Sequence, residues 1–315
     1  MAKLFSEKGL AYLSLGLTLL SISTIALADD WSDVYIGYRY GKNYSDPYQG
    51  NAIPKNVLNF AYTGSYRYGT NYFNIDLLKS TSGDPEIGST QGATEAYAVY
   101  RNVVYASKVF DAQYQYGWVR DIGATAGFDW NTKNNAYQSE KRMLVAGPTV
   151  MFDVPGFLNA SIFALWESNH PSNCAYANNM PANTCNPSTA LPNGRYQYKT
   201  HPSLNVVWGI PLEFGSARFN FKGFMDYIAS KGNLESGNPS APETHINVAM
   251  MYDMSSWWGV KNNTLQIGLE YEYWMNKFGN YNSGSAGNPA YSSPTPNSPN
   301  GAFASTPAIR FEFHF

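Results

Sequence analysis

The sequence predicts an all-β protein, a transmembrane antiparallel up-and-down β-barrel of about twelve strands. Three observations favour this fold class. Only 14% of the 315 residues are charged, against about 25% in an average soluble domain, while 16% are aromatic. Apolar residues alternate with polar ones along many short segments. The connections between these segments alternate between long and short.

Composition excludes several other classes. Mean hydropathy is −0.35, and a bundle of transmembrane helices would need several apolar runs of about 20 residues, which this chain does not have. A hydrophobic content of 44% with a net charge of −2 excludes a disordered chain. A pI of 6.1 argues against a binder of nucleic acid polymers. No cofactor motif is visible, so we expect no cofactor.

Residues 1–28 are predicted to be a signal peptide. Lys3 and Lys8 flank a charged start, and an apolar core follows from Leu10 to Leu20. That core is too short for a membrane anchor, and residues 25–28 end in the small-x-small pattern of a signal peptidase site. We expect export and cleavage after Ala28, which leaves residues 29–315 as a single outer-membrane barrel domain.

Period-two alternation is cleanest near the C-terminus. There Leu265, Ile267 and Leu269 alternate with Gln266, Gly268 and Glu270, and the pattern continues to Tyr273. This period places one face of a strand in an apolar medium and the other in a polar one. The same alternation is seen in residues 33–40, 58–67, 73–77, 203–210, 219–227, 245–252 and 309–315. Less regular strands are expected at 95–105, 110–120, 141–152 and 157–168, and no helix is expected after residue 28.

The connections between the predicted strands differ in length from one end to the other. Long ones cover residues 41–55, 81–94, 121–140, 169–199, 231–243 and 279–302. Shorter ones cover residues 69–70, 106–109, 153–156, 213–216 and 254–263. Bacterial outer-membrane barrels have short periplasmic turns and long extracellular loops. The pattern therefore predicts the outer membrane of a Gram-negative bacterium, with both mature termini on the periplasmic side.

Aromatic residues support a membrane location. The chain ends in Phe315, after alternating Phe311 and Phe313. A terminal aromatic of this kind resembles the signal that the barrel-assembly machinery recognises, so we expect this machinery as a partner, together with outer-membrane lipid. Aromatic residues also lie where strands are expected to end, as the girdles of such barrels do: Tyr66, Tyr68, Trp257, Trp258, Tyr271, Tyr273 and Trp274.

The two cysteines lie in one long connection. Cys174 and Cys185 have no nearby pair of histidines, so they do not form a zinc site, and no other metal site is expected. Exported proteins meet oxidising conditions. We therefore expect a Cys174–Cys185 disulfide that closes a surface loop.

Three stretches carry a resemblance to a known family. They are residues 147–162, residues 204–212 with 218–226, and residues 245–253 with 269–274. They resemble strand and turn segments of the Tsx-type nucleoside-specific outer-membrane channels, although the loops at 169–199 and 279–302 are longer than that family's pattern. The resemblance implies a narrow barrel that passes nucleosides. It also implies an aromatic and charged lumen that stacks bases and binds sugar hydroxyls.

The alternation itself supplies candidate lumen residues, which lie between the lipid-facing ones. Both charge signs occur among them, unlike the ring of like charges that selects one kind of ion. Such a lumen suits a neutral, polar, ring-bearing solute, and carboxylates can accept hydrogen bonds from sugar hydroxyls. The alternative is that these charges pair across a filled barrel and only support folding. The candidates are Tyr35, Arg39, Asn59, Arg67, Asn74, Asp76, Lys222, Asp226, Glu270, Glu272 and Arg310.

The predicted function is a passive, substrate-selective outer-membrane channel for nucleosides. Three alternatives remain open: a porin for other small polar solutes, a barrel enzyme that hydrolyses lipid or peptide, and a secreted sugar-binding β-sandwich. An enzyme would need a nucleophile with a histidine and an orienting group. The chain holds four histidines and no Gly-x-Ser-x-Gly motif, so we predict that it is not an enzyme. A sandwich would need a polar exterior, which about twelve alternating strands do not offer.

Overall fold

The computed structural model describes residues 31–47, 52–171, 195–235, 237–282 and 301–315. The predicted signal peptide and both cysteines lie outside the described residues. Within the described chain, twelve strands of 11–15 residues form the barrel: β1 (Ser32–Tyr44), β2 (Ile53–Tyr66), β3 (Gly69–Ser80), β4 (Thr94–Tyr105), β5 (Val119–Lys133), β6 (Arg142–Phe152), β7 (Phe157–Asn169), β9 (His201–Phe214), β10 (Ala217–Ile228), β11 (Glu243–Asp253), β12 (Leu265–Met275) and β13 (Phe303–His314). A further two-residue strand, β8 (Tyr196–Gln197), pairs with the end of β7.

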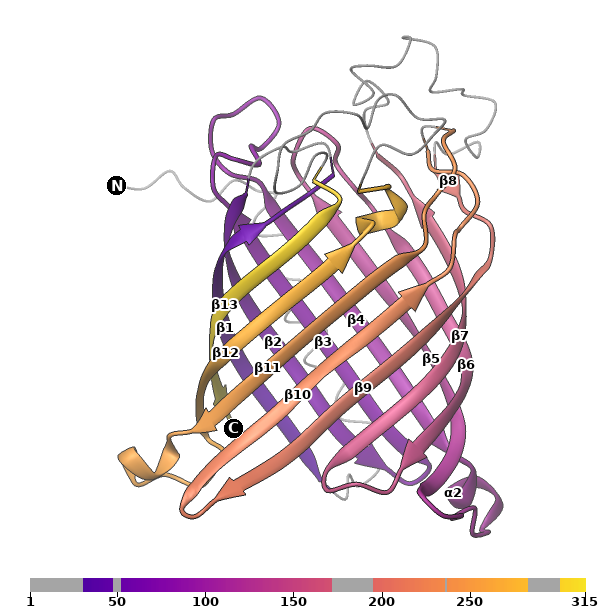
Figure 1. The fold of residues 1–315 in the computed structure, drawn as a ribbon, viewed down its shortest axis with the longest axis vertical. Coiled ribbons are helices and arrows are strands. Elements are labelled where there is room, and N and C mark those ends of the chain that lie inside the picture. Colours follow the sequence, from indigo (N-terminus) through magenta and orange to yellow (C-terminus); the bar gives the residue numbers. More distant parts are fainter. Residues whose placement is uncertain (1–30, 48–51, 172–194, 236, 283–300) are drawn as a thin grey trace.

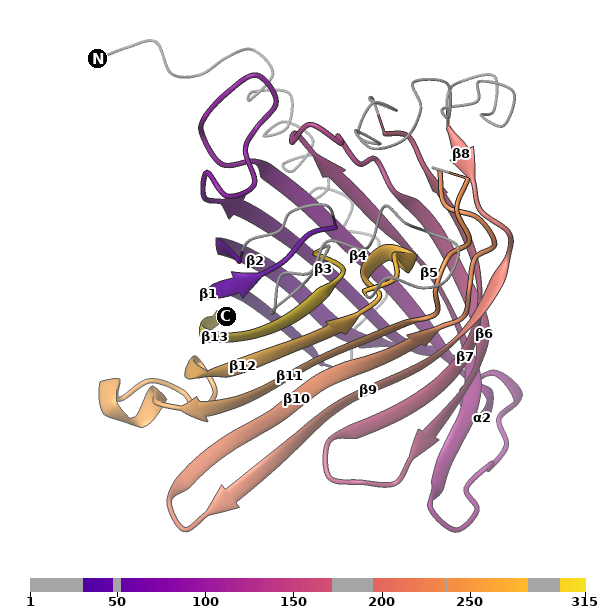
Figure 2. The ribbon, with the colours of Figure 1, turned by 45° about the horizontal axis from the view of Figure 1, so that its top comes forward.

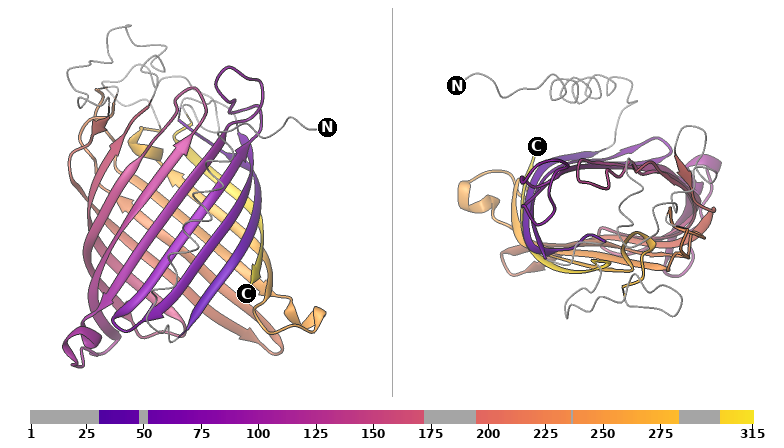
Figure 3. Two further views of the ribbon diagram at one scale, coloured as in Figure 1. Left: turned by 180° about the vertical axis from the view of Figure 1, so that it is seen from behind. Right: turned by 90° about the horizontal axis from the view of Figure 1, so that it is seen from above.

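The twelve long strands close into an antiparallel barrel, which confirms the predicted fold class (Figure 1). Each pairs with its sequence neighbours, and β1 pairs with β13, from Tyr35 opposite His314 to Gly41 opposite Ala308. Every long strand in the described chain therefore has two partners, and the barrel wall that these twelve strands form has no unpaired edge. Viewed from above, the strands enclose an elongated ring (Figure 3).

The two faces of each strand meet different surroundings. Leu144, Ile162 and Leu269 point away from the barrel axis with 58%, 61% and 71% of their surface exposed. Glu270 and Glu312, which point inward, are only 4% and 3% exposed. The alternation in the sequence is thus an alternation between an apolar exterior and a polar interior, as predicted.

The two ends of the barrel differ in their connections. At one end, which we call the short-turn end, the connections are residues 67–68, 106–118, 153–156, 215–216 and 254–264. At the other, the long-loop end, they are residues 45–52, 81–93, 134–141, 170–200, 229–242 and 276–302. Backbone hydrogen bonds from Ser65 to Trp31 and from Phe315 to Val34 place the first and last described residues at the short-turn end.

One predicted strand is wrong. Residues 110–120 do not form a strand, and 121–140 are not a loop. Instead a short helix, α2 (Ala106–Phe110), follows β4, and β5 begins at Val119. The inward side of β5 carries Gly123 and Gly127, where an added Cβ would lie 2.0 and 1.9 Å from backbone oxygens of β4. These glycines let β5 lie close to β4. With glycine at these inward positions, the strand lacks the large alternating side chains that mark the others.

The described helices are all short. Besides α2 there are two 3-10 turns, η3 (Ser255–Trp258) and η4 (Lys277–Gly279). No helix in the described ranges has the length and apolar character needed to cross a membrane.

Candidate solute pathway in the lumen

A network of charged side chains occupies the middle of the lumen, and Arg310 of β13 is its centre. The Arg310 guanidinium donates to Glu312 Oε1 (2.7 Å) and to Glu270 Oε2 (2.5 Å). Its Nη2 also donates to the Tyr35 hydroxyl at 3.0 Å. Arg39 of β1 bonds Asp76 and lies 3.6 Å from Glu270 Oε1. Strands β1, β3, β12 and β13 are therefore tied together through their inward faces.

The network extends to more distant strands. Lys222 of β10 reaches Glu312 Oε2 at 2.5 Å, although two strands, β11 and β12, separate β10 from β13. Asn247 of β11 donates to Glu270 Oε1 at 2.9 Å. Asn59 of β2 donates both to Asn74 Oδ1 and to Asp76 Oδ1, each at 2.6 Å. Buried charges need partners of this kind, since an unpaired one would cost several kcal/mol. We call this set the central network: Tyr35, Arg39, Asn59, Asn74, Asp76, Lys222, Asn247, Glu270, Arg310 and Glu312.

A second inward cluster combines rings with a carboxylate. The His245 ring stacks on Trp274, with centroids 3.8 Å apart and planes at 8°. Phe224 meets the same imidazole edge-on at 4.9 Å. Glu272 Oε2 lies 3.6 Å from His245 Nε2. Within the described chain, His245 Nε2 and Glu272 Oε1 are buried without a hydrogen-bond partner. We call Phe224, His245, Glu272 and Trp274 the ring-stack cluster; it lies on β10, β11 and β12, toward the long-loop end.

Asp226 borders the ring-stack cluster. It stands opposite His245 in the register of β10 and β11 and accepts a hydrogen bond from Asn205 Nδ2 at 2.7 Å. On the other wall of the lumen, Arg101 pairs with Asp129 at 2.6 Å, and the Tyr97 hydroxyl donates to the same carboxylate. Charges of both signs thus line the lumen, as predicted.

The structure brings most of the predicted lumen residues together. Eight of them belong to the central network: Tyr35, Arg39, Asn59, Asn74, Asp76, Lys222, Glu270 and Arg310. Glu272 and Asp226 lie instead at the ring-stack cluster. The binding of solute by these residues stays a prediction.

Two sequence-based placements are wrong. Arg67 is not in the lumen, because it lies exposed in the β2–β3 turn with its guanidinium 5.0 Å from the Tyr68 ring centroid. Trp274 is not part of an outer girdle, because its indole faces inward and donates to Glu243 Oε2 at 3.1 Å. The alternation along β12 indicates an inward Trp274, because this residue follows the inward Glu270 and Glu272 at steps of two. Glu312 was missed in the same way, two residues after Arg310.

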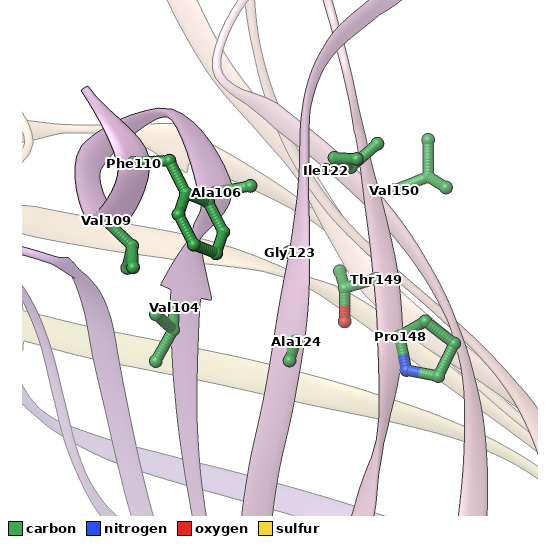
Figure 4. A pocket seen from close by; sticks show the side chains of 10 residues that line it. All are labelled: Val104, Ala106, Val109, Phe110, Ile122, Gly123, Ala124, Pro148, Thr149 and Val150. Atoms are coloured by element: carbon green, nitrogen blue, oxygen red, sulfur yellow. The ribbon is translucent and has the colours of Figure 1, made fainter. Parts of the chain in front are cut away.

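An apolar cavity lies elsewhere, beside α2. It has a volume of about 510 Å³ and is lined by residues of β4, β5, β6 and α2 (Figure 4). Val104, Ile122, Pro148 and Val150 belong to the outward-facing set of their strands. The cavity therefore opens toward the exterior of the barrel and is separate from the lumen.

The sequence matches no protein-family model and no curated protein. Solved structures with a similar arrangement include the translocator domain of the autotransporter NalP from Neisseria meningitidis, at 10% identity and a TM-score of 0.41, with all of both chains covered. The NanC porin has 10% identity and a TM-score of 0.42, over 88% of this chain and 98% of that one. The KdgM porin has 9% identity and a TM-score of 0.38, over 89% and 99%. At these values the likenesses establish neither a family nor a function for this chain.

Proposed function

We propose that this protein is a passive, solute-selective channel in the outer membrane of a Gram-negative bacterium, and that nucleosides are the solutes its lumen fits best. One observation carries the proposal: a closed barrel has an apolar exterior and a lumen lined by charges of both signs and a ring stack. The same proposal includes membership of the Tsx-type family and cleavage after Ala28. It also includes recognition of Phe315 by the assembly machinery and the absence of enzyme activity.

The exterior supports insertion into a membrane. The outward side chains of the barrel are largely apolar, among them Leu58, Leu144 and Leu269, and exposed tryptophans lie near the strand ends, with Trp31 and Trp257 at the short-turn end and Trp130 and Trp166 toward the other. Such a belt flanked by aromatic residues matches the two interfaces of a bilayer. In water, the same surface would be an aggregation hazard.

The ring-stack cluster supports a ring-bearing solute. A base stacked on an aromatic side chain gains about 1–3 kcal/mol, and Phe224 and Trp274 are rings inside the lumen, where a base would take the place of His245 or Lys277 against Trp274. Glu272 Oε1 has no hydrogen-bond partner in the described chain and can accept from a sugar hydroxyl. Glu270, in contrast, is engaged by Arg310, Arg39 and Asn247. We therefore assign the ribose contact to Glu272 rather than to both carboxylates.

The test is conductance in a planar bilayer. Adenosine or thymidine should block the current through single channels in a saturable way, and a hexose of similar size should block less. A half-blocking concentration in the high micromolar to millimolar range is expected, because a channel must release its solute. If neither nucleoside blocks while other small polar solutes pass, the protein is a porin of broader selectivity and the nucleoside proposal fails.

A further inference from the structure

A buried carboxylate sits at the long-loop mouth of the barrel, outside the central network. The pairing of β1 with β2 shifts between Gly41 and Tyr44, and the chain then leaves the wall. In Figure 2 the end of β1 extends over the lumen. Ser45 and Asp46, which follow Tyr44, are both buried. The Ser45 hydroxyl bonds the backbone oxygen of Phe303, and this contact holds the segment in place.

Three lysines surround Asp46. Its Oδ2 lies 2.7 Å from both Lys55 Nζ and Lys133 Nζ, and its Oδ1 lies 3.2 Å from Lys277 Nζ. Lys277 also donates to the Ser45 backbone oxygen at 2.8 Å. The lysine side chains are only 3–7% exposed. We call Lys55, Lys133 and Lys277 the lysine hub.

The lysine hub joins separate parts of the wall. Lys55 is on β2, Lys133 ends β5, and Lys277 follows β12. In the strand order, β5 is three strands from β2 on one side, and β12 is three strands from β2 on the other. A single carboxylate that contacts all three must stand away from the wall, within the opening.

The charges of the lysine hub are not balanced without Asp46. Lys133 has two further carboxylates within 4 Å, Asp84 at 2.7 Å and Glu95 at 3.8 Å. For Lys55 and Lys277, Asp46 is the carboxylate contacted within that distance in the described chain. Burial alone would raise the pKa of Asp46, but the three ammonium groups outweigh it and hold this pKa well below its usual range. Asp46 is thus an ionised anion bound to buried cations.

Buried ammonium groups that lose their counter-ion are costly. If the segment with Asp46 swings out of the mouth, the lysine hub therefore favours another anion in its place. Carboxylate and phosphate groups both carry the charge and the acceptor oxygens that ammonium groups bind. The lysine hub also lies next to the ring-stack cluster, because Lys277 Nζ is 4.5 Å from the centroid of the Trp274 ring.

We propose that Lys55, Lys133 and Lys277 form an anion-binding site at the mouth, with Asp46 as its resident occupant, and that a carboxylate or phosphate group of an entering solute replaces Asp46. The inference rests on the proposed channel for its role and refines its substrate class. The favoured solute carries a ring and an anionic group, as a nucleoside monophosphate does, because such a molecule spans the ring-stack cluster and the lysine hub together.

The experiment uses the full mature chain, folded in detergent, with inorganic phosphate as the probe. Its melting temperature is measured against phosphate concentration and against chloride at equal ionic strength. Wild-type protein should show a saturable rise with phosphate that chloride does not give. Asp46→Asn should bind phosphate about tenfold more tightly, because the tethered carboxylate, present at a millimolar effective concentration, no longer competes.

The matched control is Asp111→Asn, the same chemical change at the exposed end of α2, where the backbone (φ 49°) also accommodates asparagine. It should behave as wild type. Adding Lys55→Gln and Lys277→Gln to Asp46→Asn should abolish the phosphate response.

Equal phosphate affinity in wild type and Asp46→Asn would overturn the proposal, and so would a response that survives the two lysine changes. If Asp46→Asn does not fold, the wild-type titration decides, because phosphate must then stabilise the protein beyond chloride in a saturable way. None of these measurements involves transport. Their failure would leave nucleoside block intact, and an absence of block would not affect phosphate binding.

Discussion

Neighbouring inward residues of β12 have different tasks. Glu270 binds two arginines and an asparagine of the wall, whereas Glu272 and Trp274 present a buried oxygen without a partner and a ring. We expect Trp274→Leu to weaken adenosine block by about fivefold or more, since roughly 1 kcal/mol of stacking is lost. Glu272→Gln should weaken block a few-fold. The measurement is the concentration that halves single-channel current, and ion conductance should change little.

Glu270→Gln is the matched control for Glu272→Gln. It carries the same chemical change two residues away and should leave the half-blocking concentration near that of wild type. Equal effects of the two glutamine variants would show that the ring-stack cluster is not the solute contact.

Asp46 gives stability a pH dependence of known sign. Its pKa in the folded protein is well below its usual range, because three lysines outweigh the effect of burial. A carboxyl group with a lowered folded pKa stabilises the protein fully above its unfolded pKa of about 3.9, and this contribution disappears as the pH falls toward the folded pKa. The difference in melting temperature between wild type and Asp46→Asn should stay constant from pH 7 to pH 5 and shrink below about pH 4. Asp84 and Glu95, which also contact Lys133, are present in both proteins. A difference that instead grows on acidification would contradict the paired state of Asp46.

Along each strand, lipid-facing and lumen-facing positions alternate, so that neighbouring residues lie in different surroundings. Leu269 is 71% exposed on the exterior of β12, so an arginine there would meet hydrocarbon at a cost of about 2–4 kcal/mol near the bilayer centre. We expect Leu269→Arg to reduce the heat-modifiable, folded form in the outer-membrane fraction. Glu270→Gln should still assemble, because Arg310 retains its ion pair with Glu312 and Arg39 retains its ion pair with Asp76. Its free energy of unfolding should fall by about 1–3 kcal/mol with the weakened hydrogen bonds. Equal assembly of the two variants would contradict the assigned faces.

The long loop between β7 and β8 carries both cysteines, outside the described residues. Cys174 and Cys185 are predicted to be joined in the exported protein. Maleimide should therefore fail to label the unreduced native protein, and labelling after reduction alone should be complete. The double change Cys174→Ser and Cys185→Ser should leave the amount of folded barrel unchanged, because the bridge would close only a local loop. Labelling without reduction would contradict the disulfide.

The sequence predicts an element well where large side chains alternate, and poorly where small ones do. The alternation predicts β12 almost to its bounds and the second half of β13, because Leu269 and Phe311 stand beside Glu270 and Arg310. β5 was misplaced because glycine, alanine and threonine fill most of its middle, and its register depends on pairing with β4 and β6. Helix α2 was missed for a related reason: its five residues are too few to show a helical period.

For the molecule as a whole, closure of the barrel brings the inward faces of the twelve long strands together around one lumen. Parity placed Arg39, Glu270 and Arg310 on inward faces, but it could not say that Arg39 lies near Glu270, since β1 comes close to β12 only when β1 pairs with β13. The same limit applies to Asp46, which lies beyond the alternating part of β1 and reaches the lysine hub only in the closed barrel. Contacts between distant strands depend on topology and not on local pattern.

Solute passage through the closed barrel is tested most directly by uptake into lipid vesicles. Purified protein is reconstituted into vesicles, and entry of labelled adenosine is followed with no gradient of ions or energy source. Vesicles that contain folded protein should equilibrate adenosine faster than vesicles prepared with the heat-denatured chain, with saturation in the high micromolar to millimolar range. A hexose of similar size should enter more slowly. Uptake of adenosine no faster than in vesicles with the denatured chain would contradict a nucleoside channel.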